Sequence, residues 1–235
     1  MPLNLKSLLD WKYAIREIIL IVIGITIAFT LDNWNTNRKL RNSEIEILSE
    51  LNETLKSDFN DINDNLKLYK KCNNGINVIL NAFDNDLPMH DSLIIHFSTL
   101  LVNPMFFRND GPYEVLKSKG FELISNEQLR LNIINLYSVR YRVLDLQETS
   151  HPQFQGYEIL FEFVKEHFKK SDKPNISEYY SVSIEPYNFT ELKNDQEFRF
   201  LLNQVLFWNQ MKINFYEYTK KVVLQLQDDI EKEIN

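Results

Sequence analysis

The sequence has few of the residues that make turns and none of the covalent cross-links that hold small domains together. Glycine and proline together account for 12 of 235 residues, about 5% against roughly 12% in average composition. This scarcity argues against a many-stranded sandwich or barrel, favours long helices, and leaves little glycine for a phosphate-binding loop. The single cysteine excludes an internal disulfide framework and a thiolate metal cluster.

A basic surface for nucleic acid is also missing from the chain as a whole. Lysine and arginine number 26 against 33 aspartates and glutamates, so the net charge is −7 and the isoelectric point about 5.2. We therefore predict no nucleic-acid partner. Hydrophobic residues make up 44% of the chain, which is typical of a folded protein and too many for a disordered one.

The sequence contains no complete catalytic motif of the common enzyme classes. His-Glu-x-x-His, the Gly-x-Ser-x-Gly nucleophile motif and the glycine patterns of nucleotide-binding loops do not occur. Glu158, Glu162 and Glu166 share one helical face, but two lysines follow them, and we interpret this face as solvated. We predict no cofactor, no metal and no enzymatic activity.

One long apolar run lies near the start of the chain, from Ile18 to Leu31. As a helix it would cover about 21 Å, less than the roughly 30 Å of a hydrocarbon core. Trp11 and Trp34 flank the run, and the helix between them would be about 35 Å long, which matches a bilayer with its interfaces. The pattern predicts a tail over 1–12 and a single transmembrane helix over 13–34, in contact with the lipid bilayer.

A short apolar run can also belong to three other kinds of segment. A cleaved signal peptide would need a small-x-small site after the run, and the sequence FTLDNWN offers none. An interfacial helix would need a polar face, which the run lacks. The third alternative is the buried core helix of a soluble protein.

The charges on either side of the run are nearly balanced, so the positive-inside rule almost ties. The free amino group favours an N-terminus inside, which predicts a single-pass protein of the inner (cytoplasmic) membrane with its C-terminal part on the periplasmic side. The flanking cations are Lys6, Lys12 and Arg16 before the run, and Arg38, Lys39 and Arg41 after it.

A carboxylate lies at the start of the predicted membrane helix. Glu17 either reaches the hydrated surface beside Arg16 or pairs with a neighbouring helix, since membrane carboxylates usually face protein or water. Gly24 and Ala28 follow on the same helix, and small residues four apart allow close helix approach. These three residues, with Trp11 and Trp34, are our candidate membrane and self-association contacts.

Beyond the membrane helix, the pattern predicts a helical extramembrane domain over 35–235. A stalk helix is expected over about 38–72, ending at the sequence CNNG, Cys72–Gly75. A second apolar row drifts from Leu51 to Phe59, which favours a globular bundle over a parallel coiled coil, although both stay open. The seven-residue repeat consists of Leu48, Leu55, Ile62 and Tyr69.

The end of the chain shows helical spacing over about 195–234, and an antiparallel pairing of this helix with the stalk is the simplest arrangement. Between them, Ser125 and Gln128 match a capping box and predict the start of a helix that runs to about Gln147. One short extended piece is expected, at 181–184. The predicted fold class is mainly α.

A segment between Arg108 and Arg142 carries six cations and four anions, so it is positive inside a negative chain. Arg140 falls on the inward face of its predicted helix, where a guanidinium needs a partner. Either it pairs with Asp145 or Glu114, or it holds a small anion or the carboxylate of a protein partner together with Arg130. The candidate anion or partner contacts are Arg130, Arg140 and Tyr113.

Two stretches resemble an uncharacterised bacterial family of small single-span membrane proteins. The first is YAIREIILIVIGITIAFTLDNW at 13–34, and the second lies between Tyr113 and Tyr137. The family often has glycine where this chain has Arg16, a departure that puts close helix contact there in doubt. Because the family has no assigned activity, the resemblance implies a similar architecture and nothing about catalysis. The matching residues are Glu17, Gly24, Ile25, Ile27, Ala28, Asn33 and Trp34, then Tyr113, Leu116, Ser118, Gly120, Ile124, Asn126, Leu129, Arg130 and Tyr137.

From these features we predict a non-enzymatic, membrane-anchored helical protein that acts in protein interaction, as a scaffold or as a sensor, with an unknown protein partner and a possible homo-oligomeric state. An alternative from another class is an oligomeric membrane effector or channel that gathers Glu17 along a central path.

Overall fold

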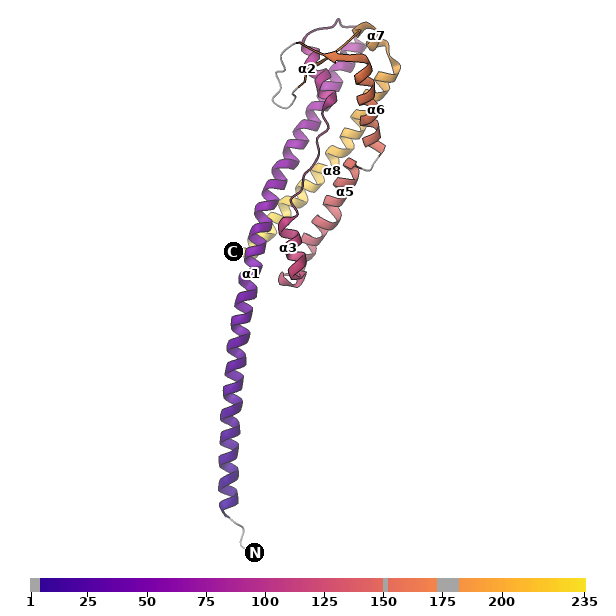
Figure 1. Cartoon of the computed structure of the whole chain (residues 1–235). Helices are drawn as coiled ribbons and strands as arrows, with labels where there is room; N and C mark the ends of the chain where they lie inside the picture. Colours follow the sequence, from indigo (N-terminus) through magenta and orange to yellow (C-terminus); the bar gives the residue numbers. More distant parts are fainter. Residues whose placement is uncertain (1–4, 150–151, 173–181) are drawn as a thin grey trace.

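The computed structural model describes residues 5–149, 152–172 and 182–235 of the chain, and within them the side chains of all but 5–10, 12 and 152–156 (Figure 1). The described part is mainly helical, as predicted. Its elements are α1 (Leu5–Asp84), α2 (Ser92–Ser98), η1 (Thr99–Leu101), α3 (Gly111–Lys119), η2 (Phe121–Leu123), α4 (Glu127–Asn135), η3 (Leu136–Arg140), α5 (Tyr141–Thr149), α6 (Pro152–His167), β1 (Phe168–Lys170), β2 (Ile184–Pro186), α7 (Phe189–Asn194) and α8 (Gln196–Ile234).

Helix α1 has 80 residues, which corresponds to about 120 Å. Its N-terminal part stands free, and its C-terminal part lies within a helical bundle (Figure 1). The predicted end of the stalk helix at Cys72 is wrong, because α1 continues through the CNNG sequence to Asp84 without a break.

Close packing explains why Gly75 does not end the helix. A Cβ atom added there would lie 2.5 Å from Oγ1 of Thr99 and 3.3 Å from its Cγ2, so the glycine lets η1 approach the backbone of α1. Thr99 is buried and its hydroxyl donates to the carbonyl of His96 at 2.7 Å. Burial of this contact outweighs the low helix propensity of glycine.

We expect Gly75→Ala to destabilise the bundle, although alanine is the better helix former. Propensity alone would stabilise by up to about 1 kcal/mol, but overpacking against Thr99 costs about 1–3 kcal/mol. Thermal unfolding followed by circular dichroism measures the balance. Asn74→Ala, at an exposed position of the same turn, is the control, and a Gly75→Ala protein more stable than wild type would refute the close-packing explanation.

The last helix, α8, lies antiparallel to the bundle part of α1, so the C-terminus returns to the middle of α1 (Figure 1). Contacts along the pair show the direction: Arg199 pairs with Asp84 at 2.6 Å, whereas Arg41 pairs with Glu233 at 3.3 Å. The predicted long final helix and its antiparallel pairing with the first helix are therefore confirmed, with α8 beginning one residue later than the expected start at 195.

Two hydrophobic cores follow one another along the α1–α8 pair. The first packs the middle of α1 and the C-terminal part of α8 against α3, α4, η3 and α5. The second packs the end of α1 and the start of α8 against α2, α6, α7 and the two short strands. In the first core, fully buried side chains on α1 include Leu48, Leu51, Leu55 and Ile62; in the second, Ile76 and Ile79 do the same.

The start of α4 differs from the predicted capping box. The cap is Asn126, whose side-chain oxygen accepts from the N–H of Leu129 at 3.1 Å. Ser125 instead bonds to another helix, because its N–H and hydroxyl both donate to Oε1 of Glu44, at 2.6 and 2.8 Å. The helix then continues through a π-helical turn, η3, into α5, so the predicted helix to about Gln147 is present in three consecutive pieces.

The two short strands pair antiparallel, with Phe168 opposite Pro186 and Lys170 opposite Ile184. The predicted extended piece at 181–184 overlaps β2 at Ile184, and its first residue lies outside the described part of the chain. The hairpin closes the end of the bundle that lies farthest from the free part of α1 (Figure 1).

Candidate functional site

All five candidate membrane contacts lie on the free part of α1 with exposed side chains; they are Trp11, Glu17, Gly24, Ala28 and Trp34. This part of the helix contains a window long and apolar enough to cross a membrane, with mean hydropathy 2.2 and no buried residue. A Cβ atom at Gly24 would meet nothing within 4 Å, so the face that a second helix would use is open.

The bundle is attached to α1 directly after this free part. Nη1 of Arg41 donates to Oε2 of Glu44 at 2.7 Å, and Nη2 donates to the carbonyl of Glu233, at the end of α8, at 2.5 Å. Asn126 adds a hydrogen bond to Glu233 at 2.8 Å. Burial raises the pKa of Glu44, but the hydrogen bonds from Arg41 and Ser125 outweigh it and hold that pKa below its ordinary value. We call this set the Arg41 clamp.

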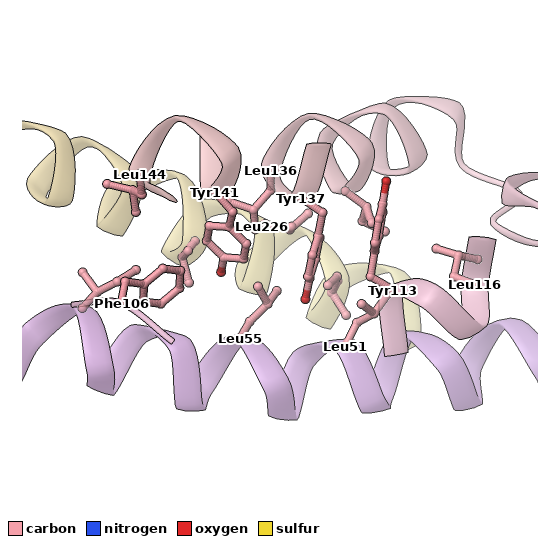
Figure 2. Close-up of a cluster of buried hydrophobic side chains, with 14 of the residues drawn as sticks. Leu51, Leu55, Phe106, Tyr113, Leu116, Leu136, Tyr137, Tyr141, Leu144 and Leu226 are labelled. Atoms are coloured by element: carbon pink, nitrogen blue, oxygen red, sulfur yellow. The ribbon is translucent and has the colours of Figure 1, made fainter. Parts of the chain in front are cut away.

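Tyr113, a predicted anion or partner contact, is a core residue. Only 9% of it is exposed, and its ring stacks on that of Tyr137 with the centroids 4.4 Å apart and the planes at 4°. Figure 2 shows the two rings side by side above α1, near Leu51. Its ring contributes to packing in the first core, so Tyr113 does not present a binding surface.

Arg130 is likewise engaged within its own chain. Its Nη1 donates to the carbonyl of Ile124 at 3.2 Å, which closes the turn before α4. It lines neither of the grooves that contain Arg140. The structure therefore does not bring Arg130, Arg140 and Tyr113 together at one site.

Arg140 is half-buried and its guanidinium carbon lies 4.8 Å from the centroid of the Tyr218 ring on α8. Neither carboxylate of the expected internal ion pair is its partner. Asp145 pairs with Arg108 at 3.1 Å, and Glu114 pairs with Lys117 at 3.2 Å. Among the residues that the structure describes, Arg140 has no carboxylate partner.

Two adjoining grooves meet at Arg140 and Tyr218, on the side of α8 that faces η3 and α5. The polar groove, of about 360 Å³, is lined by Asn132, Asn135, Arg140, Tyr218, Lys221, Val222, Gln225, Leu226 and Asp229. The apolar groove, of about 440 Å³, is lined by Arg140, Val143, Leu144, Met211, Asn214, Phe215, Tyr218 and Thr219.

A second polar site, which the sequence did not reveal, holds the segment Val102–Asp110. This segment, which we call the strap, has neither helix nor strand and runs beside α1 from η1 to α3 (Figure 1). Side chains of the helices bind its backbone through hydrogen bonds that α1 provides from Asp58, Asp61, Asn65 and Tyr69, and α5 from Glu148.

The carboxylates among these side chains accept from N–H groups of the strap. Glu148, 3% exposed, accepts from the N–H of Phe106 at 3.1 Å and from the hydroxyl of Tyr216. Asp58, 2% exposed, accepts from the N–H of Asn109 at 3.3 Å and from the hydroxyl of Tyr141 at 2.7 Å. These side chains replace the regular backbone hydrogen bonds that the strap lacks.

Burial dominates the electrostatics of both carboxylates. It raises the pKa of Asp58 to about 6, against the lowering by hydrogen bonds from Tyr141 and Asn109. It also raises the pKa of Glu148, against hydrogen bonds from Tyr216 and Phe106 and the charge of Lys212. The ammonium of Lys212 is itself buried, which lowers its pKa, and it donates to Oδ1 of Asn103 at 3.3 Å.

A comparison with known protein families shows which family the chain belongs to. A family model matches residues 17–151, which is 135 of 235 residues and more than half of the chain. The chain belongs to DUF6090. This is a family of unknown function, so the family resemblance of the sequence is confirmed while the membrane character and motif that we associated with it stay predictions. No curated protein and no solved structure matches the chain.

The DUF6090 match includes the free part of α1 from Glu17, the strap, Arg140 and Glu148, and it ends before α6. The partners that α8 supplies, Tyr216 and Tyr218, therefore lie outside the matched region. The sites beside the strap and Arg140 are each completed by a helix that the family model does not include.

Other candidate groups have simpler roles. Glu158, Glu162 and Glu166 are exposed, in agreement with the predicted solvated face, and no cluster within the described residues has the ligands for a metal ion. Cys72 is buried, and its thiol donates to the carbonyl of Thr99 at 3.6 Å. A thiol in this position is poorly accessible to reagents in solution.

Proposed function

We propose that this DUF6090 protein is a membrane-anchored, non-enzymatic interaction module. The apolar part of α1 crosses the bilayer once, and the bundle stands on one side, where it binds another protein. One observation carries the proposal: a single uninterrupted helix joins an exposed, apolar, membrane-length stretch to the core of a folded bundle. An exposed apolar stretch of this length is unstable in water and stable in lipid.

The Arg41 clamp supports a mechanical link between membrane and bundle. Arg41 follows Trp34 by about 10 Å along the helix, and it binds Glu44 on α1 and Glu233 at the end of α8. Glu44 in turn accepts hydrogen bonds from Ser125, in the loop before α4. The clamp therefore ties the loop before α4 and the end of α8 to α1 at the end of the bundle nearest the apolar stretch. From Trp34 to Asp84 the helix extends about 75 Å, so α1 would hold the hairpin end of the bundle far from the lipid surface.

Exposed aromatic side chains on the bundle support a protein partner. Phe107, Tyr187, Phe200 and Phe207 are each more than half exposed. Aromatic residues are enriched where one protein binds another. Phe200 and Phe207 are two turns apart on α8, so they present one face of the helix to solvent.

The topology is tested with two variants that each add one cysteine to the wild-type chain, Ser7→Cys before the apolar stretch and Ser118→Cys on an exposed position of α3. In bacterial cells with a permeabilised outer membrane, we expect a membrane-impermeant maleimide to label only the Ser118→Cys variant, because the proposed N-terminus lies inside. Wild type, whose Cys72 is buried, is the unlabelled control. Labelling of the Ser7→Cys variant alone would reverse the orientation, and a protein in the soluble fraction would refute the anchor.

The same membranes are used to test whether the bundle binds another protein. A photo-reactive phenylalanine analogue at Phe207 is expected to form one covalent adduct of defined mass, whereas the analogue at the exposed, polar position Lys56 is the control. Mass spectrometry of the adduct distinguishes a second copy of this chain from another protein. No adduct from position 207, or the same adducts from both positions, would contradict partner binding on α8.

A further inference from the structure

Arg140 is shared by the two grooves on the side of α8 that faces η3 and α5, and it is a half-buried cation without a carboxylate partner among the described residues. Its guanidinium lies over the Tyr218 ring, which orients the planar group and reduces the entropy lost when the group binds a ligand. A planar guanidinium held in this way matches a carboxylate, with which it forms paired hydrogen bonds.

The polar groove adds a second cation and several neutral donors. Lys221 follows Tyr218 by one turn of α8 and lines the same groove as Arg140. Asn132 and Asn135 contribute amide groups from α4. Near Lys221, Glu217 lies one turn earlier on α8 and is paired with Lys70 at 2.8 Å, outside the groove lining.

The far end of the polar groove sets a limit on the charge of a ligand. Asp229 lines this end, two turns beyond Lys221 and about 12 Å along the helix. Its Oδ1 accepts from Nε2 of Gln225 at 2.9 Å, which fixes the carboxylate in the groove. A second negative group on a ligand that extended in this direction would meet this carboxylate, so the groove favours a single anionic group near Arg140.

The apolar groove provides room for an uncharged body next to that anionic group. Its walls are Val143 and Leu144 on one side and Met211 and Phe215 on the other. Its volume of about 440 Å³ falls within the usual range for small-molecule sites, roughly 300–1,000 Å³. The combination of one apolar wall and a few convergent polar groups is typical of such sites.

We propose that the two grooves form a binding site for a small monocarboxylate with an apolar body. The carboxylate binds Arg140 and Lys221, Tyr218 holds the guanidinium in place, and the apolar body lies along Val143 and Met211. The site gives the bundle a ligand of defined chemistry, and it stands independently of the membrane anchor and of the protein partner.

Phenylbutyrate, a water-soluble carboxylate with an aromatic body, is a suitable probe. We expect isothermal titration calorimetry of the full chain in lipid nanodiscs to show saturable binding of one phenylbutyrate molecule per chain. Phenylbutanol, which has the same body without the charge, is expected to bind at least about tenfold more weakly, because a charged hydrogen bond is lost. Empty nanodiscs correct for partition of either probe into the lipid.

Two variants at the site and one control variant beside it locate the binding. Arg140→Gln is expected to weaken phenylbutyrate binding at least about tenfold, and Arg142→Gln, the same change of charge at an exposed position two residues away, leaves it unchanged. Val143→Glu fills the apolar groove and supplies a carboxylate to Arg140 at a spacing of three residues, so it also abolishes binding. Circular dichroism confirms that each variant is folded.

Loss of binding in Arg140→Gln and Val143→Glu, with retention in Arg142→Gln, supports the site. Equal affinity in wild type and Arg140→Gln, equal affinity for phenylbutyrate and phenylbutanol, or no saturable binding to wild type would each overturn it. None of these readouts depends on where the protein resides in the cell or on the adduct formed from position 207.

Discussion

Replacing Glu148 by leucine is expected to destabilise the bundle by about 2–5 kcal/mol. The leucine has a similar size, but it leaves the N–H of Phe106 and the hydroxyl of Tyr216 buried without their acceptor. A buried polar group that loses its partner costs about 1–3 kcal/mol, and two such groups are affected. In a chain of this length the loss corresponds to a fall in melting temperature of roughly 5–15 °C.

Glu148→Gln is the matched control for this substitution. It retains the shape and one carbonyl oxygen as acceptor, so we expect its melting temperature to stay within a few degrees of wild type. A large loss in Glu148→Leu together with a small loss in Glu148→Gln assigns the effect to the hydrogen bonds to the strap. Equal, small losses in both variants would show that the strap does not depend on Glu148.

A pair of tyrosines provides a second control within the same core. Tyr216→Phe removes a hydroxyl that bonds to Glu148, whereas Tyr137→Phe removes a buried hydroxyl that has no hydrogen-bond partner among the described residues. We therefore expect Tyr216→Phe to be destabilising by about 1–2 kcal/mol and Tyr137→Phe to be neutral or stabilising.

The strap also shows which part of the fold was readable in the sequence. The apolar repeat from Leu48 to Tyr69 gives one face of α1 correctly, because burial of large aliphatic residues at seven-residue spacing determines which side of a helix faces the core. The length of α1 was underestimated, because the contact that keeps Gly75 helical is made by Thr99, 24 positions later in the chain.

The sequence of α1 does contain a signal for the strap, in the form of polar residues at core positions. Phe59 packs against the first core, as the drift of the second row predicts. A further row on α1 runs from Leu51 at the same seven-residue spacing through Asp58, Asn65 and Cys72, all of which are buried. Two polar residues in a core row indicate that a backbone without its own hydrogen bonds crosses there. The identity of that backbone, the strap, depends on tertiary packing and could not be derived from spacing.

The candidate site beside Arg140 was predictable only in part. The sequence correctly marks Arg140 as a residue on the inner side of its helix. The partners predicted for Arg140 were Asp145 or Glu114 in an ion pair, or a ligand held together with Arg130. In the fold, Asp145 forms an ion pair with Arg108, and Arg140 lies over the ring of Tyr218 on α8. Pairings between residues this far apart in sequence depend on how α8 lies against η3, which no local pattern contains.

Asp58 provides the second large expected effect, a loss of stability as the pH rises. Its pKa is about 6 in the folded protein because of burial, compared with an ordinary value of 3.8. The folded state therefore holds the proton more tightly than the unfolded state. Its contribution to stability is complete below the unfolded pKa and is lost as the pH rises through 6. The full contribution is about 3 kcal/mol, since one pKa unit corresponds to about 1.4 kcal/mol.

Between pH 5 and pH 7.5, Asp58 alone is expected to account for a loss of about 1.4 kcal/mol in the free energy of unfolding. The neighbouring carboxylates Asp61 and Asp110 act in the same direction on its pKa, while Tyr141 and Asn109 oppose them through hydrogen bonds. Asp58→Asn keeps an acceptor in this position and carries no charge, so the variant should lack this part of the pH dependence.

The measurement is denaturant unfolding of the full chain in nanodiscs at a series of pH values, for wild type and Asp58→Asn. Other groups also contribute to the pH dependence of stability, including His96, whose pKa burial lowers and whose effect on stability has the opposite sign. The difference between the two pH profiles removes their contribution. Asp64→Asn, at an exposed carboxylate less than two turns away on α1, is the control and should follow wild type. Parallel profiles for wild type and Asp58→Asn would show that Asp58 is ionised in the folded protein at pH 5, and that the hydrogen bonds from Tyr141 and the strap outweigh the cost of its burial.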